Sequence, residues 1–162
     1  MSEIRHRTLV EAFRSADPGR PFLTFWRPAA DPNEETFTFG GFLDLAARFA
    51  GRFARDGAAR GDRVILVMPP GPDVMAAFAG AMLLGAIPTI LAYPNFKIDP
   101  DKYAHGLRGV IEHLSAQLVV LHQDFPDDLR TNVIAAASGA RIVSSALTDA
   151  PPMDISQLPS PD

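Results

Sequence analysis

Hydrophobic and polar positions near the N-terminus predict a short helix followed by a hairpin. Thr8-Leu9-Val10-Glu11 has the residues of a capping box, in which the Thr hydroxyl and the Glu carboxylate satisfy free backbone N–H groups. A helix to about Ser15 is therefore predicted. Residues 22–26 and 35–39 then read as strands on either side of the Asp31-Pro32-Asn33 turn, the second by alternation. The two strands predict an antiparallel hairpin.

The clearest helical pattern follows this hairpin, because apolar residues recur there at intervals of three and four. The apolar positions are Phe42, Leu45, Ala46, Phe49, Ala50, Phe53 and Ala54. Asp44 and arginines lie opposite them, so we expect one face to pack and the other to contact solvent. Thr38 is the expected N-cap and Gly57 the expected stop.

Strand-like and helix-like segments alternate along the rest of the chain. Strands are predicted at residues 63–68, 87–93, 117–122 and 140–144, and helices at about 72–84, 100–114 and 126–137. Such repeats form right-handed crossovers between parallel strands. The predicted fold is therefore α/β, with an open, mostly parallel sheet, helices on both faces and the N-terminal antiparallel hairpin. Pro88 falls within a predicted strand, so it should lie where its missing N–H is not needed.

The uncharged window of residues 74–96 raises the question of a membrane span. Its helical part is only about a dozen residues, whereas a bilayer requires about 20. A buried helix followed by a buried strand accounts better for this window. The charged N-terminus is not followed by an apolar segment, so no signal peptide is expected.

Composition narrows the class of protein further. The chain has 162 residues, of which 47% are hydrophobic and 21% charged, which suits one globular domain or one lobe of a larger one. It has no cysteine, which excludes disulfides and thiolate metal sites and agrees with a cytoplasmic location. The net charge is −4 and no basic stripe is present, so we expect no nucleic-acid partner.

Signatures of familiar catalytic and nucleotide sites are missing, including GxxxxGK[ST], GxGxxG, GxSxG and HExxH. His105 and His113 lie on one predicted helix, but Glu112 points elsewhere and no third ligand is evident, so solvated histidines are favoured over a metal site. Asp127 and Asp128 resemble paired carboxylates. They fall in the first turn of a helix, where the helix dipole already accounts for negative charge.

Two loops follow the carboxyl ends of predicted strands, where open parallel sheets tend to bind ligands. Tyr93-Pro94-Asn95-Phe96-Lys97 is the candidate substrate-facing loop, and Lys102 lies shortly after it. The alternative, which is favoured, is a rigid turn in which Pro94 fixes the backbone and Phe96 covers the sheet. Met68-Pro69-Pro70-Gly71 is the second loop, and the free N–H groups of the helix after it could face an anion.

Three stretches, taken in order, resemble a known family. Thr38-Phe39-Gly40-Gly41-Phe42-Leu43 resembles the T-[YF]-x-E-L opening of that family, although Gly41 stands where a Glu is usual. Gly61-Asp62-Arg63-Val64 resembles its GDRV strand entry, and residues 78–88 resemble its helix-to-strand element A-x-L-x-G-A-x-x-[VP]-P. The family is the adenylate-forming superfamily, which includes acyl-CoA synthetases, fatty acyl-AMP ligases and nonribosomal adenylation domains. Residues 95–97 and 156–162 resemble the fatty acyl-AMP ligase branch.

The resemblance implies an ATP- and Mg²⁺-dependent enzyme that converts a carboxylic acid, here a fatty acid, to an acyl-adenylate. The acyl group would then pass to the thiol of coenzyme A or of an acyl carrier protein. The family's phosphate loop, ribose Asp and catalytic Lys would all fall after residue 162, and neither Lys97 nor Lys102 matches that Lys. No catalytic, nucleotide-binding or metal-binding residue is therefore assigned in this chain.

Residues 1–147 are accordingly expected to form the N-terminal α/β subdomain of such an enzyme, and residues 148–162 a linker with little to bury. On this interpretation the chain alone is inactive, binds no cofactor, and has the remainder of the enzyme as its partner. Two alternatives stay open. One is a stand-alone, non-catalytic binding or regulatory module, and the other is an unrelated flavodoxin-like binding domain with a five-stranded sheet.

Overall fold

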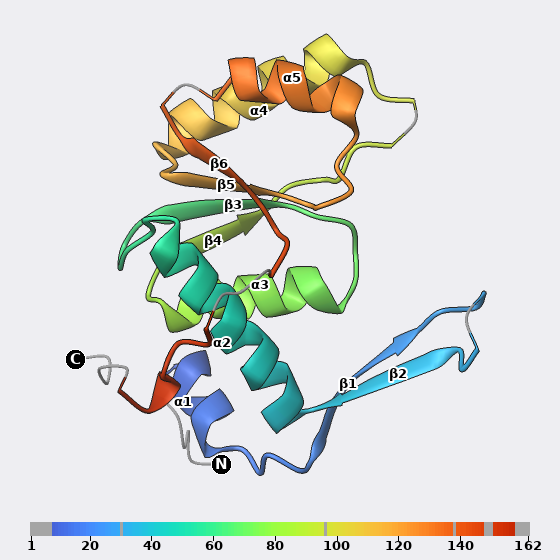
Figure 1. The fold of residues 1–162 in the computed structure, drawn as a ribbon, viewed down its shortest axis with the longest axis vertical. Coiled ribbons are helices and arrows are strands. Elements are labelled where there is room, and N and C mark those ends of the chain that lie inside the picture. Colours follow the sequence, from blue (N-terminus) through green and yellow to red (C-terminus); the bar gives the residue numbers. More distant parts are fainter. Residues whose placement is uncertain (1–7, 30, 96, 138, 148–150, 158–162) are drawn as a thin grey trace, which may run out of the picture.

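The computed structural model describes residues 8–29, 31–95, 97–137, 139–147 and 151–157, and it has a parallel sheet between two helical layers (Figure 1). The helices are α1 (Leu9–Ser15), α2 (Phe39–Arg55), α3 (Pro72–Leu83), α4 (Pro100–Leu114), α5 (Asp127–Ala135) and a 3₁₀ turn, η1 (Ile155–Gln157). The strands are β1 (Pro21–Trp26), β2 (Glu34–Thr38), β3 (Arg63–Val67), β4 (Ile87–Ile90), β5 (Leu118–Leu121) and β6 (Arg141–Ser144). The predicted α/β fold with an N-terminal hairpin is confirmed.

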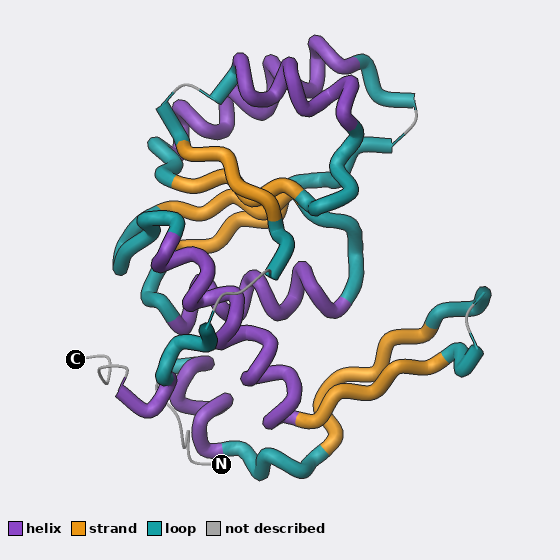
Figure 2. Tube along the Cα trace, in the orientation of Figure 1, coloured by secondary structure: helices purple, strands orange, loops and turns teal. Residues whose placement is uncertain are grey.

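The main sheet has four strands in the order β4-β3-β5-β6, and every pair in it is parallel. Helices α2 and α3 cover one face, and α4 and α5 cover the other (Figure 2). Side chains of β3 alternate between the two faces: Val64 and Leu66 enter one core, and Ile65 and Val67 enter the other. Residues buried on both faces explain the continuous apolar run of this central strand.

Strand β4 lies at the edge of this sheet and ends at Ile90, three residues before the predicted end. The backbone N–H groups of Ile87 and Leu91 donate toward β3, to Asp62 and Leu66, so the intervening Pro88 points its nitrogen away from β3. Its missing N–H therefore breaks no ladder bond, as the sequence required. Among the described strands, β4 pairs with β3 alone, and it ends here because β3 itself ends at Val67.

The segments that carried the family resemblance contact each other at the opposite end of β3. The N–H of Gly61 donates to the carbonyl of Gly85 at 2.9 Å, and the N–H of Ile87 donates to the carbonyl of Asp62 at 2.8 Å. Both glycines have φ near +80 to +90°, which a residue with a side chain rarely adopts. Gly61 and Asp62 thus fix, through these two hydrogen bonds, the turn that connects α3 to β4.

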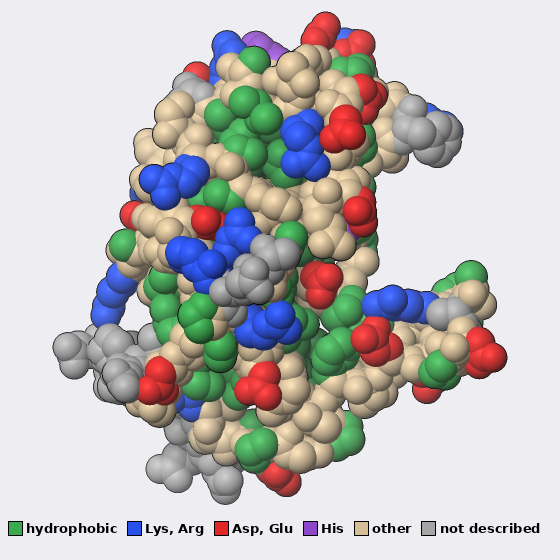
Figure 3. Space-filling view, viewed as in Figure 1, with side chains coloured by type: hydrophobic (Ala, Val, Ile, Leu, Met, Phe, Trp, Pro, Cys, Tyr) green, Lys and Arg blue, Asp and Glu red, His purple; other side chains and the backbone are tan. Residues whose placement is uncertain are grey.

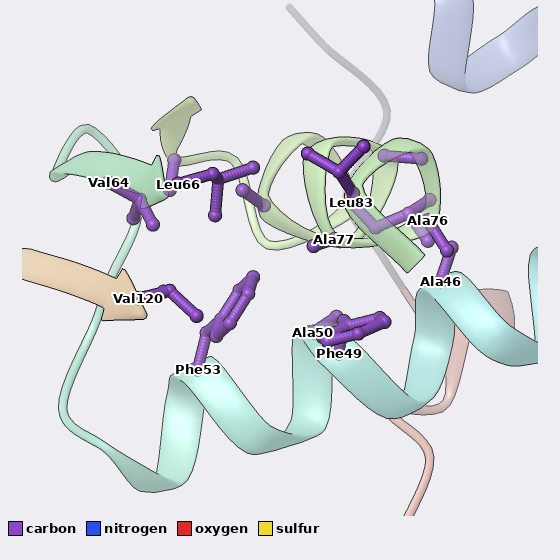
Figure 4. Close-up of a cluster of buried hydrophobic side chains, with 14 of the residues drawn as sticks. Ala46, Phe49, Ala50, Phe53, Val64, Leu66, Ala76, Ala77, Leu83 and Val120 are labelled. Carbon is purple, nitrogen blue, oxygen red and sulfur yellow. The ribbon is translucent and has the colours of Figure 1, made fainter. Parts of the chain in front are cut away.

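Helix α2 begins as its capping chemistry predicts, since the Thr38 hydroxyl accepts the N–H of Gly41 at 3.2 Å. Its apolar face packs on α3 and the sheet, and Phe49 and Phe53 point from α2 into that core (Figure 4). The polar face is exposed at Asp44, Arg48 and Arg55, as expected, whereas Arg52 is half-buried. Arg52 donates to the Ala146 carbonyl at 2.6 Å and pairs with Asp56, and Arg48 donates to the Leu147 carbonyl. These arginines hold the chain after β6, and Lys and Arg side chains gather over this region in Figure 3.

Residues 151–157, which belong to the predicted linker, contact α2. The N–H of Met153 donates to the Ala47 carbonyl at 2.9 Å, and Met153 and Ile155 pack on the α2–α3 core. Gly51 permits this approach, because a Cβ there would overlap the Pro151 carbonyl. Residues 148–150 and 158–162 lie outside the described residues. None of the described helices is both long and apolar enough to cross a bilayer.

The packing of α2 on α3 predicts a strong effect at Gly80. A Cβ at this position would lie 2.5 Å from the Ala46 carbonyl oxygen and 2.8 Å from the Phe49 Cβ. Gly80→Ala should therefore force the two helices apart and lower the free energy of unfolding by about 1–3 kcal/mol, measured by urea denaturation.

Gly109→Ala is the matched control, because a Cβ there meets no atom within 4 Å. It should raise the free energy of unfolding by about 0.5–1 kcal/mol, because Ala has a higher helix propensity than Gly. Equal stabilisation by both substitutions would contradict the close approach at Gly80.

Candidate functional site

The four parallel strands end at one edge of the sheet, and the segments that follow them form the candidate site. These segments are residues 68–71 after β3, 91–95 and 97 after β4, 122–125 after β5 and 145–147 after β6. The N–H of His122 donates to the Val67 carbonyl, and the N–H of Ser145 donates to the Leu121 carbonyl. The strand ends are therefore in register at this edge.

The predicted substrate-facing loop is anchored at its start by Tyr93. The Tyr93 hydroxyl donates to the Asp124 carbonyl at 2.9 Å, and its ring meets those of His122 and Phe125 edge-on, each at 6.0 Å. Pro94 is buried. These contacts give the first half of the loop the character of a fixed turn.

The second half of the loop faces outward. The Asn95 side chain accepts the N–H of Lys97 at 2.9 Å, which closes a local turn, and both residues are exposed. Phe96, which was expected to cover the sheet, lies outside the described residues. Whether this loop faces a substrate stays a prediction.

Tyr103, on α4, supports this loop. Its role was not predicted from the sequence. Its hydroxyl donates to the Ala92 carbonyl at 3.0 Å, and its ring stacks obliquely near Phe125. Burial, and then the nearby Tyr93, raise the pKa of Tyr103 to about 12. Burial, followed by the Asp124 carboxylate, also raises the pKa of Tyr93, against a smaller lowering by Arg130. Both phenols are therefore protonated donors at neutral pH.

His122 joins this loop to a neighbouring hollow and was also missed from sequence. Its side chain is 15% exposed, and its Nδ1 accepts the N–H of Asp124 at 3.2 Å. The neutral ring consequently carries its proton on Nε2. The available signal was its position directly after the apolar strand β5, at the edge where ligands bind.

The hollow lies between the hairpin and the start of α3, with a volume of about 590 Å³. Its lining residues are Phe25, Trp26, Arg27, Pro69, Pro70, Gly71, Pro72, Asp73 and His122. Arg27 is bound to Glu35 at 2.6 Å, and Asp73 stands in the first turn of α3. The hollow therefore presents both signs of charge beside an apolar wall, which suits a polar ligand with an aromatic or aliphatic part.

The remaining candidates from sequence do not join this site. His105 and His113 are exposed on α4, and Asp127 pairs with Arg130 at 3.4 Å in the first turn of α5, next to exposed Asp128. In the described part of the chain, no group of three or more His, Asp or Glu side chains could hold a metal ion.

Comparison with known proteins relates this fold to acid-activating enzymes. The sequence profile of a family described as "AMP-binding enzyme" matches residues 10–160. A 3-hydroxybenzoate–CoA ligase from Aromatoleum sp. (strain CIB) is 27% identical over 99 residues, which are 61% of this chain and 18% of that protein.

Solved structures share the fold at low sequence identity. One, in which McyG A-PCP is complexed with phenylalanyl-adenylate, has a TM-score of 0.79 and 23% identity, and the match covers 99% of this chain and 29% of that one. A fatty acyl-adenylate ligase from L. pneumophila, in complex with acyl adenylate and pyrophosphate, has a TM-score of 0.69 and 21% identity, covering 98% and 26%. The present chain thus spans less than a third of the length of these relatives.

The tyrosine anchors predict how stability changes in alkali. The folded-state pKa of Tyr103, about 12, lies above the ordinary tyrosine pKa of 10.0, so the unfolded chain loses this proton first as pH rises. The stabilisation is complete below pH 10 and is lost between pH 10 and about 12. Tyr103→Phe should therefore flatten the fall in the free energy of unfolding across this window, measured by urea denaturation at several pH values.

At neutral pH the same variant should be less stable by about 0.5–1.5 kcal/mol, because it loses the hydrogen bond to Ala92. A slope between pH 10 and 12 that is unchanged in Tyr103→Phe would show that this phenol does not titrate as described.

Proposed function

Because the chain belongs to the AMP-binding enzyme family, we propose that it is the N-terminal lobe of an ATP-dependent ligase that activates a carboxylic acid. In this reaction a carboxylate oxygen attacks the α-phosphorus of ATP. An acyl–phosphate bond forms, the bond between the α- and β-phosphates breaks, and pyrophosphate leaves. A thiol of coenzyme A or of a carrier protein then attacks the acyl carbon, and AMP leaves.

The observation that carries this proposal is the family match over nearly the whole chain, residues 10–160. The names of the relatives support the chemistry: one is a CoA ligase, and the solved neighbours include complexes with an acyl adenylate and a phenylalanyl-adenylate. We propose a fatty acid as the substrate, which the resemblance of residues 95–97 and 156–162 to the fatty acyl-AMP ligase branch favours.

Within this enzyme we propose that the lobe contributes one wall of the substrate site, at the carboxyl ends of its strands, and that it does not supply the reacting groups. Transition states of phosphoryl and adenylyl transfer require cations and donors at developing charge. The described residues of this chain assemble no metal-binding cluster. Polypeptide outside this chain would supply ATP and Mg²⁺ binding, while Asn95 and Lys97 would face the substrate from a loop held by Tyr93 and Pro94.

A stand-alone, non-catalytic binding or regulatory module is the second candidate. The specific observation in its favour is that the sheet buries a core on each face. In addition, no described buried side-chain nitrogen or oxygen lacks a hydrogen-bond partner. The unrelated flavodoxin-like alternative is wrong, because the chain matches the AMP-binding family and its described parallel sheet has four strands.

Exchange of radiolabelled pyrophosphate into ATP tests the proposal. The 162-residue chain should give no acid-dependent exchange with octanoate, dodecanoate, 3-hydroxybenzoate or phenylalanine. The same chain, extended by the polypeptide encoded directly downstream of it, should give exchange that depends on one class of these acids and on Mg²⁺.

Exchange catalysed by the 162-residue chain would refute the division of labour between this lobe and the rest. A folded extended protein without exchange for any of the four acids would favour the binding-module candidate instead. Thermal unfolding followed by circular dichroism establishes in either case that the proteins compared are folded.

A further inference from the structure

A second hollow lies on the flank of α4, between this helix and the segment that follows β4. Its volume is about 400 Å³. The lining residues are Leu91, Ala92, Ile98, Lys102, Tyr103, Gly106, Leu107 and Val110. None of them lines the hollow beside the hairpin, so the two are separate features of the surface.

The lining of this groove is apolar except at one point. Tyr103 contributes its ring, because its hydroxyl is already bonded to the Ala92 carbonyl at 3.0 Å. That phenol is neutral at pH 7 even at its ordinary pKa of 10.0, and burial raises its pKa further, to about 12. Lys102 is the charged residue among the eight that line the groove, and it is exposed. The groove thus combines an aliphatic wall with one cationic group at its rim.

Gly106 gives the groove part of its width. A Cβ built at this position meets no atom within 4 Å, so the space above the helix is open there. Beyond the groove, the same face of β4 carries Thr89 and then a further exposed apolar side chain. Ile87 is 52% exposed, and strand alternation places it on the same face of the sheet as Leu91.

We propose that this groove binds a linear aliphatic monocarboxylate, with the chain along α4 and the carboxylate at Lys102. The volume falls within the range of about 300–1,000 Å³ that is usual for small-molecule sites. Each methylene removed from water contributes about 0.8 kcal/mol, and the carboxylate gains an ion pair at the rim. Charge complementarity therefore selects a fatty acid over an uncharged alkyl chain.

Addition of a strand from a second copy is a poorer fit for this side of the molecule. The outward edge of β4 carries Pro88, which has no N–H to donate to an added strand. An apolar peptide segment would also leave the cation of Lys102 unused. These occupants are outcomes of the experiment below.

This inference goes beyond the proposed function, because it concerns a groove apart from the hollow beside the hairpin and does not rest on adenylate formation. Binding is measured without ATP, so its failure would leave the proposed activity untouched. Failure of pyrophosphate exchange would equally leave the groove untouched.

Titration of the ¹⁵N-labelled chain with octanoate, followed by amide chemical shifts, tests the site. We expect saturable shifts confined to residues 91–92 and 98–110. Gly106→Leu should fill the groove without overlap and weaken octanoate binding about ten-fold or more, since the chain loses its apolar contacts.

Gly109→Leu is the matched control. It places the same side chain on the same helix, again with no atom within 4 Å of the new Cβ, but outside the groove lining. It should leave octanoate binding unchanged. Equal weakening by both variants would overturn the assignment of the groove.

Lys102→Gln separates the role of the charge from that of the apolar wall. It should weaken octanoate binding about two- to five-fold, the range expected for an exposed ion pair, and leave 1-octanol binding unchanged. This variant alters an exposed side chain, so it decides the outcome even if a Gly→Leu variant fails to fold.

Three results would overturn the proposal. The first is the absence of saturable shifts with octanoate. The second is an equal effect of Lys102→Gln on octanoate and 1-octanol. The third is concentration-dependent self-association of the chain that Gly106→Leu removes, which would assign the groove to a second copy.

Discussion

The close contact between α2 and α3 sets the geometry of one whole side of this molecule. Gly80 lies against the Ala46 carbonyl and the Phe49 Cβ, so the two helices approach at backbone distance. That approach brings Phe49 and Phe53 of α2 within reach of the same core as Val64 and Leu66 of β3. A larger residue at the crossing would separate the helices and open the core, because interiors at native density have no room to absorb the displacement.

The local pattern of hydrophobic and polar residues was sufficient to predict most of the fold. The 3.6-residue period of α2 and the alternation of β-rich and helical segments predicted the layers and the parallel sheet. The cap at Thr38 and the outward placement of Pro88 also followed from the chemistry of single residues. The strand expected to continue to Tyr93 ended at Ile90, because a strand can pair only as far as its neighbour extends. The residues of β4 do not determine the length of β3, so this end could not be predicted from the sequence of β4.

The contacts missed from sequence join residues far apart in the chain. Arg52 reaches Ala146, Met153 bonds to Ala47, and Tyr93 reaches Asp124. In sequence these residues look like a solvated arginine, part of a linker and part of a loop. Their partners are 94, 106 and 31 positions away, so only the folded arrangement identifies them. The sequence predicted only part of the candidate site for the same reason. The ends of the predicted strands located the edge of the sheet, but Tyr103 and His122 contribute to the site through tertiary contacts.

Trp26 is the single tryptophan of the chain, and it stands 66% exposed on the hairpin that extends from the body (Figure 1). Intrinsic tryptophan emission from this protein therefore comes from a water-exposed indole that belongs to neither core and lines the hollow beside α3. A conventional fluorescence melt would therefore report the surroundings of the hairpin rather than the packing of the parallel sheet. Because no other tryptophan contributes to the emission, a change in this signal would report a polypeptide that covers the hairpin.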